Sequence, residues 1–176
     1  MDDKRAIFEQ TILPHLDTAY NLARWLAGNE HDAEDIVQES CLRAVKFFGN
    51  FRGGNARAWL LAVVRNTAYT WLKRRQASQA QFHLDEGNFE IEDRAANPDT
   101  LLTTRSNIEK VRGAIAQLPP EFREVIVLRE MEDYSYKEIA DLVDVPVGTV
   151  MSRLARGRKQ LQKILCEESQ TSEGKS

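Results

Sequence analysis

Residues 145–159, VPVGTVMSRLARGRK, hold four cations and no carboxylate. On a helical wheel Val150 and Leu154 share an apolar face, while Arg156 and Lys159 lie on the opposite side. Arginine and lysine at this spacing bind the phosphates of nucleic acid, and polar side chains in the first turn of such a helix reach base edges. The segment therefore predicts a DNA-reading helix.

A second stripe with nucleic-acid chemistry lies on the helix expected from Asn55 to about Arg75. Trp59, Asn66 and Tyr69 share its outward side, beside several arginines. Aromatic rings stack on unpaired bases, at about 1–3 kcal/mol per base, while cations follow the backbone of a single strand. The preceding glycine-rich loop, FRGGN, would let the backbone approach an extruded base. Packing of Trp59 and Tyr69 on the first helix is the open alternative.

The helix expected to begin at Asp32 has an acidic outward face, with Glu34, Asp35, Gln38 and Glu39. No histidine accompanies these carboxylates at Glu-x-x-His spacing, and no nucleophile or phosphate-binding glycine motif is present. The two cysteines and three histidines are too scattered for a disulfide framework or a metal site. We therefore expect no catalytic residue, no metal and no cofactor. The face is either solvated or a dock for cationic side chains of a partner.

The net charge of −3 hides a separation of charges along the chain. Residues 1–39 carry 3 basic and 9 acidic side chains, and residues 40–84 carry 8 basic and none acidic. Residues 85–100 carry 1 basic and 6 acidic side chains. The local charges, unlike the overall balance, therefore predict two separate sites for nucleic acid.

Helical periodicity accounts for almost all of the sequence before residue 76 and resumes near Ile108. The stretch between is polar and acidic, contains Gly87 and Pro98, and has no period, which is typical of a linker. The expected fold class is all-α, with two small helical domains at 1–76 and 106–165, a flexible acidic linker at 77–105 and a disordered tail at 166–176.

The second of these domains has the pattern of a helix-turn-helix. Ser135 and Glu138 form a capping box before one short helix, and the connection DVPVG (144–148) separates it from the cationic helix. A capped helix, a tight turn and a cationic second helix are typical of DNA-binding modules. A solvated basic face on an ordinary helical hairpin is the alternative.

Targeting signals are not apparent in the sequence. No apolar run approaches the roughly 20 residues that a bilayer requires, and the first residues, MDDKRAIFEQ, lack the core of a signal peptide. We therefore expect a cytoplasmic protein without membrane insertion.

Three stretches together resemble bacterial sigma factors of the extracytoplasmic-function group: HDAEDIVQESCLRAVKFF, FRGGNARAWLLAVVRNTAYTWLKRR and LPPEFREVIVLREMEDYSYKEIADLVDVPVGTVMSRLARGRKQL. The resemblance covers roughly residues 5–75 and 106–165, in the family's order. It implies a non-enzymatic sigma factor that binds core RNA polymerase, recognises the minus-ten and minus-thirty-five promoter elements and initiates DNA-templated transcription. An anti-sigma factor is a further implied partner. A dimeric helix-turn-helix regulator with an N-terminal sensing or dimerisation domain is the alternative function.

The resemblance also implies roles for individual residues. The acidic helix would dock on the clamp helices of the largest polymerase subunit, through Asp35, Gln38 and Glu39. The minus-ten element would be melted, and a flipped base captured, by Phe51, Arg52, Asn55, Trp59, Arg65, Asn66, Tyr69, Lys73 and Arg74. The minus-thirty-five element would be bound by Tyr136, Lys137, Thr149, Met151, Ser152, Arg153, Ala155, Arg156, Arg158 and Lys159.

Two of these positions have particular expectations. Arg153 lies nearer the apolar side of its helix than Arg156, so we expect a phosphate or intramolecular contact for it rather than base readout. The position of Met151 is often basic in the family, so the missing cation is expected to weaken a phosphate or guanine contact there.

Overall fold

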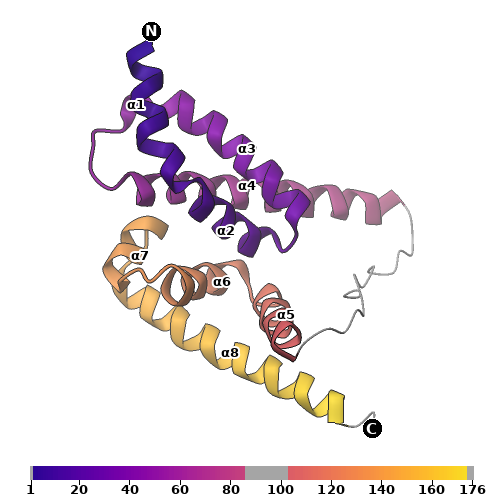
Figure 1. Ribbon diagram of the computed structural model, residues 1–176. Helices are drawn as coiled ribbons and strands as arrows, with labels where there is room; N and C mark the ends of the chain where they lie inside the picture. Colours follow the sequence, from indigo (N-terminus) through magenta and orange to yellow (C-terminus); the bar gives the residue numbers. More distant parts are fainter. Residues whose placement is uncertain (1, 86–102, 174–176) are drawn as a thin grey trace.

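The computed structural model describes residues 2–85 and 103–173, and all regular secondary structure within those ranges is helical (Figure 1). The first helical group contains α1 (Asp2–Ile12), the 3-10 turn η1 (Leu13–His15), α2 (Leu16–Ala27), α3 (Glu30–Phe47), the 3-10 turn η2 (Phe48–Asn50) and α4 (Ala56–Asp85). The second helical group contains α5 (Thr103–Ala116), α6 (Pro120–Ile126), the π-helical turn η3 (Val127–Met131), α7 (Tyr136–Val143) and α8 (Val147–Glu173). The predicted all-α class with two helical units is confirmed.

Local capping signals set several helix ends in the first group. Gly28 ends α2, with a left-handed φ of 85° that glycine adopts without steric cost. Asn29 caps α3 by accepting the backbone N–H of Asp32 at 2.9 Å. Asp32, the cap expected from sequence, therefore lies inside the first turn. Asn55 accepts the N–H of Ala58 at 3.0 Å, so the expected start of α4 is correct.

Two helices run further than the sequence pattern indicated. α4 continues ten residues past Arg75, so residues 77–85, expected to be linker, are helical. α8 includes residues 166–173, expected to be disordered. Neither stretch contains glycine or proline, and extending an existing helix through such residues needs no new nucleus. Residues 86–102 of the expected linker lie outside the described residues, and its last three residues, 103–105, begin α5. No helix within the described ranges has the length and apolar character needed to cross a membrane.

Each group has its own buried side chains. In the first, α2, α3 and α4 pack through residues such as Leu22, Ile36 and Leu60, all at most 1% exposed. In the second, α6 and α8 approach so closely that a Cβ at Gly157 would lie 2.9 Å from the Ile126 side chain. A side chain at position 157 would therefore force the Ile126 side chain to shift.

The two groups also pack against each other. Contacts join α2 to α5 and α6, and α4 to α7, while α3 lies on the side of the first group away from the second (Figure 1). The buried apolar residues of both groups form one continuous cluster. The two helical groups are therefore packed together around a shared core.

Candidate nucleic-acid interface

The helix-turn-helix consists of α7, a short turn and α8. Ser135 accepts the N–H of Glu138 at 3.2 Å, and the Glu138 carboxylate accepts the N–H of Ser135 at 2.7 Å, so the predicted capping box is present. These bonds to backbone and hydroxyl lower the pKa of the Glu138 carboxyl. Asp144 ends α7 with a left-handed φ of 57°, and α8 begins three residues later. The geometry is thus set by signals within a few residues of the turn.

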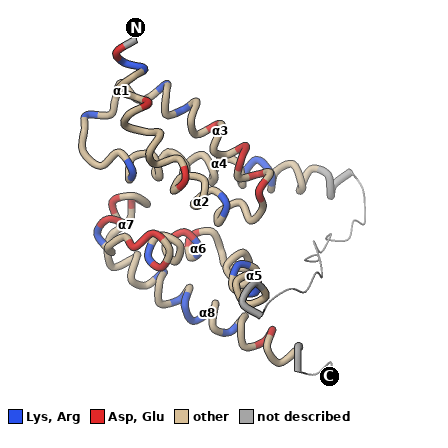
Figure 2. Tube along the Cα trace, in the orientation of Figure 1, with Lys and Arg blue, Asp and Glu red and all other residues tan. Residues whose placement is uncertain are grey.

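One face of α8 is open to solvent. Met151 is 53% exposed, and Arg156 and Lys159 are exposed and form no ion pair with any described residue. Lys and Arg positions lie along α8 in Figure 2. The other predicted residues of this site are exposed at Lys137, Ser152 and Ala155 and half-buried at Tyr136 and Thr149. A cationic surface of this kind is available to duplex DNA without rearrangement of the second group.

Two further arginines of α8 are held by carboxylates from the same group. Arg158 donates to Glu130 Oε1 at 2.6 and 3.2 Å, and this hydrogen bonding raises the pKa of the Arg158 guanidinium. Arg153 lies 3.7 Å from Glu124 Oε1. Of the two contacts expected for Arg153, the structure contains the intramolecular one.

An aromatic cluster fixes the glycine-rich loop before α4. The rings of Phe51 and Trp59 lie 5.4 Å apart, and both lie against Phe48, which in turn meets Phe8 edge-on at 5.1 Å. Trp59 is therefore half-buried, and the rings that lie nearest to it belong to η2 and the loop. Arg52 and Asn55 remain exposed on the loop.

The middle of α4 faces the second helical group. Arg65 donates to both carboxylate oxygens of Glu124 on α6, at 2.7 and 3.1 Å. The Glu124 side chain is fully buried, and that of Arg65 is 20% exposed. The Arg65 guanidinium also lies over the Tyr69 ring at 4.5 Å. The structure thus brings these two predicted minus-ten residues together, beneath α6 rather than in solvent.

Burial affects the chemistry of Tyr69. Its hydroxyl is buried without a hydrogen-bond partner among the described residues, and this desolvation raises the pKa of the phenol. An unsatisfied buried hydroxyl costs about 1–3 kcal/mol. The remaining predicted residues of α4, Asn66, Lys73 and Arg74, are exposed.

The outward face of α3 mixes acidic and apolar side chains. Asp35 and Gln38 are exposed, whereas Glu39 is half-buried and accepts a hydrogen bond from Arg43. Leu42 and Val45 continue this face and are 73% and 60% exposed. Periodicity places Leu42 on this outer side, so the sequence already carries a signal that the face is not purely acidic.

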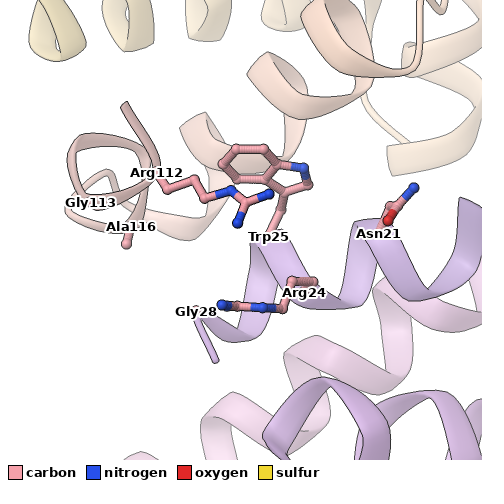
Figure 3. Close-up of a pocket in the computed structure, with 7 residues that line it drawn as sticks. All are labelled: Asn21, Arg24, Trp25, Gly28, Arg112, Gly113 and Ala116. Carbon is pink, nitrogen blue, oxygen red and sulfur yellow. The ribbon is translucent and has the colours of Figure 1, made fainter. Parts of the chain in front are cut away.

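Two further observations on the described residues concern metal ligands and a pocket. Within residues 2–85 and 103–173, no group of three or more metal-ligating side chains converges. A pocket of about 160 Å³ lies between α2 and α5, at the seam between the helical groups (Figure 3). Its lining residues are Asn21, Arg24, Trp25, Gly28, Arg112, Gly113 and Ala116, and the Arg112 guanidinium lies 5.8 Å from the Trp25 ring.

Comparison with known sequences identifies both helical groups. The sigma-70 region 2 family matches residues 11–78, and the sigma-70 region 4 family matches residues 108–161. The chain is 33% identical over 162 residues to the ECF RNA polymerase sigma factor SigE of Mycolicibacterium smegmatis, covering 92% of this chain and 63% of that protein. It is 34% identical to the RNA polymerase sigma-H factor of Pseudomonas aeruginosa, covering 93% and 88% of the two chains. It is 36% identical to the ECF RNA polymerase sigma-E factor of Escherichia coli K12, covering 74% and 72%.

Solved structures have similar folds. The sigma factor RpoE, crystallised with the anti-sigma factor NepR from Bartonella quintana, has 27% identity and a TM-score of 0.70, covering 90% of this chain and 96% of that one. CnrH, solved with the cytosolic domain of CnrY, shares the fold with a TM-score of 0.63 at 23% identity, covering 93% and 90%. With two sigma-70 regions in order and relatives that match along most of their length, this chain belongs to the extracytoplasmic-function group of the sigma-70 family.

Proposed function

We propose that this chain is a specificity subunit of bacterial RNA polymerase, which binds core polymerase, recognises a promoter and initiates DNA-templated transcription. The observation that carries the proposal is the presence of both sigma-70 regions, each on its own helical group. The role is that of an initiation factor rather than an enzyme, and it is exercised in the cytoplasm, where the polymerase acts.

The minus-thirty-five element is assigned to the helix-turn-helix. The exposed residues Met151, Ser152 and Ala155 lie near the start of α8, where a recognition helix reaches base edges. Arg156 and Lys159 follow as exposed cations that bind phosphates and fix the register of the helix on DNA. Arg158 lies on the same surface, where it is paired with Glu130.

The minus-ten element is assigned to the loop before α4 and to α4 itself. Arg52 and Asn55 are accessible on the loop, and Asn66, Lys73 and Arg74 are accessible on the helix. Tyr69 supplies a ring for stacking once it is uncovered, and Arg65 supplies a cation beside it. Phe51 and Trp59 hold the loop through the aromatic cluster.

Core polymerase is assigned to the outward face of α3. Asp35 and Gln38 are exposed there, and Leu42 adds apolar area to the same face. An interface of this composition combines charge pairing with desolvated apolar contact, as protein–protein interfaces do. The similar sigma factor RpoE is in complex with the anti-sigma factor NepR, so we include an anti-sigma factor among the partners of this chain.

The proposed function is tested by transcription from promoters that this chain activates. Overexpression in a bacterial host followed by transcript sequencing identifies promoters, which then serve as templates for purified protein and core polymerase. The proposal predicts transcripts that require both the protein and the promoter. A folded chain that gives none would contradict it.

A charge reversal tests the docking face. Asp35→Arg is expected to abolish binding to core polymerase while leaving the helical content unchanged, because the site is exposed. Asp17→Arg, an exposed position on α2, makes the same change of charge elsewhere and is expected to bind normally. Core affinity that stays unchanged in Asp35→Arg would remove the assignment of α3.

A further inference from the structure

The pocket between α2 and α5 is lined by two arginines from different helical groups. Arg24 belongs to α2 and Arg112 to α5. Figure 3 shows Arg112 reaching from α5 toward the Trp25 ring and Arg24 lying near the end of α2, with both guanidinium groups at the same pocket. Neither arginine forms an ion pair with a carboxylate of the described residues. Two like charges thus converge on a space of about 160 Å³ without a described anion to balance them.

Packing and helix dipoles explain only part of this arrangement. Arg24 lies in the last turn of α2, where the helix dipole stabilises a cation. Arg112 does not lie in the last turn of α5, so the dipole does not account for it. The carbonyls at the ends of these two helices have a different donor, because Arg123 donates to Leu26 and to Ala116, each at 2.7 Å. Arg24 and Arg112 are therefore left available to an anion that the chain binds from outside.

Trp25 joins this pocket to an apolar groove. The indole lines both, and the groove of about 380 Å³ is otherwise formed mainly by Ile108, Val111 and Met131. Ile108 is 51% exposed and Met131 is 44% exposed, so this apolar surface is open to solvent. The Arg112 guanidinium lies 5.8 Å from the Trp25 ring and lines both cavities. A cationic pocket and an apolar groove thus share one aromatic wall.

We propose that these two cavities form one binding site for a nucleoside phosphate. The phosphate lies between Arg24 and Arg112, because guanidinium groups match the geometry and charge of phosphate oxygens. The base stacks on Trp25 and covers the apolar groove. The two volumes together lie within the range of about 300–1,000 Å³ that is usual for small-molecule sites.

Three features favour a nucleoside phosphate over an apolar carboxylic acid. Two guanidinium groups match the two negative charges of a phosphate better than the single charge of a carboxylate. A flat indole favours a flat ring over a flexible acyl chain. Asn21 lines the pocket and Asn107 lines the groove, and their side-chain amides can both donate and accept hydrogen bonds with a ribose or a base edge.

The site is complete only while the two helical groups are packed together. Arg24 and Trp25 come from α2, whereas Arg112 and Ile108 come from α5. A ligand that needs both walls therefore binds the packed form and stabilises it by mass action. The inference goes beyond the proposed function, because it gives a small-molecule ligand to a surface to which neither DNA nor polymerase is assigned.

Calorimetric titration of the full-length chain, without DNA or polymerase, tests the site with ADP, GDP, adenosine and decanoate as probes. We expect both diphosphates to bind at least about tenfold more tightly than adenosine, because adenosine lacks the charged hydrogen bonds to phosphate. Arg24→Gln and Arg112→Gln should each weaken the binding of ADP about tenfold or more. Lys110→Gln is the matched control, because Lys110 is an exposed cation of α5 that does not line the pocket. It should bind ADP as the wild type does.

Tryptophan fluorescence locates the base. ADP should quench the emission of the wild type, and Trp25→Phe should remove most of that change because the stacked indole is gone. Trp71→Phe is the control and should keep the change, since Trp71 lies on α4 and lines neither cavity. The melting temperature should rise with ADP concentration in the wild type but not in the double variant Arg24→Gln, Arg112→Gln.

The outcomes separate this inference from the proposed function. Absence of binding by ADP and GDP at millimolar concentration would overturn the site. Equal affinities for ADP and adenosine would rule out the phosphate contact, and decanoate that binds more tightly than ADP would show that the ligand class is wrong. Quenching that persists in Trp25→Phe would contradict stacking on this ring. None of these measurements involves a promoter or polymerase, so transcription tests the sigma-factor role separately.

Discussion

α4 and α8 are both cationic helices, yet only one is available in this structure. On α8, Arg156 and Lys159 are exposed and unpaired among the described residues, whereas on α4 the side chain of Arg65 is 20% exposed and held by a carboxylate. Both helices follow from the same sequence signal, a stretch rich in cations and poor in carboxylates. The difference shows that local charge identifies a nucleic-acid surface, while long-range packing decides whether it is open in the free chain.

The largest expected effect concerns the open helix. Arg156→Ala should weaken binding to duplex promoter DNA about tenfold or more, since a hydrogen bond to a charged group contributes about 1.5–3 kcal/mol. Arg158→Ala should cost less, because its cation is already bonded to Glu130. Fluorescence anisotropy with the same duplex measures both. Equal losses would mean that pairing within the chain does not distinguish cations on α8.

The packing that supports the open helix can be tested next. Gly157→Ala should lower the free energy of unfolding by about 1–3 kcal/mol, because the new methyl would meet Ile126 and Phe122. Gly113→Ala on α5 meets nothing within 4 Å and should instead raise stability by about 0.5–1 kcal/mol. Urea denaturation followed by circular dichroism gives both values. A neutral Gly157→Ala would show that the Ile126 side chain makes room for the methyl without cost.

A smaller effect is expected where α8 lacks a cation. Met151→Arg adds a positive charge at an exposed position of the helix. It should increase the slope of log affinity against log salt by about 1 for duplex DNA, because one more counterion is released. Met151→Gln is the uncharged control. A slope that is the same in both variants would indicate that the side chain at this position does not approach a phosphate.

The smallest effect concerns the covered helix. Tyr69→Phe removes a hydroxyl that has no partner among the described residues but keeps the ring. The free energy of unfolding should therefore stay the same or rise by up to about 1 kcal/mol, as measured by thermal denaturation. Single-stranded DNA binding should not fall, because stacking needs only the ring. Tyr69→Ala, which loses the ring as well, should reduce both. A marked loss of stability in Tyr69→Phe would reveal a hydrogen bond to this hydroxyl.

The fold was predictable where signals are local. The capping box at Ser135, the stop at Gly28 and the cap at Asn55 depend on residues within one turn, and each is present. Helix ends without glycine or proline were less predictable, so α4 and α8 extend past their expected limits. Composition alone does not show at which residue a helix ends when no glycine or proline stops it.

The candidate site was predictable as a set of surfaces but not as an arrangement. Leu61 is 1% exposed and lies on the same side of α4 as Arg65, which pairs with α6 of the second group. The pairing of Arg65 with Glu124 joins residues 59 positions apart. No periodicity within either segment indicates such a partner, so the roles of these residues in DNA binding remain predictions for the experiments above.

The π-helical turn at Val127–Met131 has a consequence for how this chain tolerates change. The N–H of Glu132 bonds to the carbonyl of Val127, five positions earlier, so the turn holds one residue more than an α-helix would. Deleting a single residue there would restore regular α-helical winding instead of disrupting it. Because the wider turn already takes up the extra residue, Glu132 would keep nearly the same orientation relative to α6 after the deletion. The chain would thus tolerate a shortening by one residue at this turn, with Glu132 still in reach of Arg57.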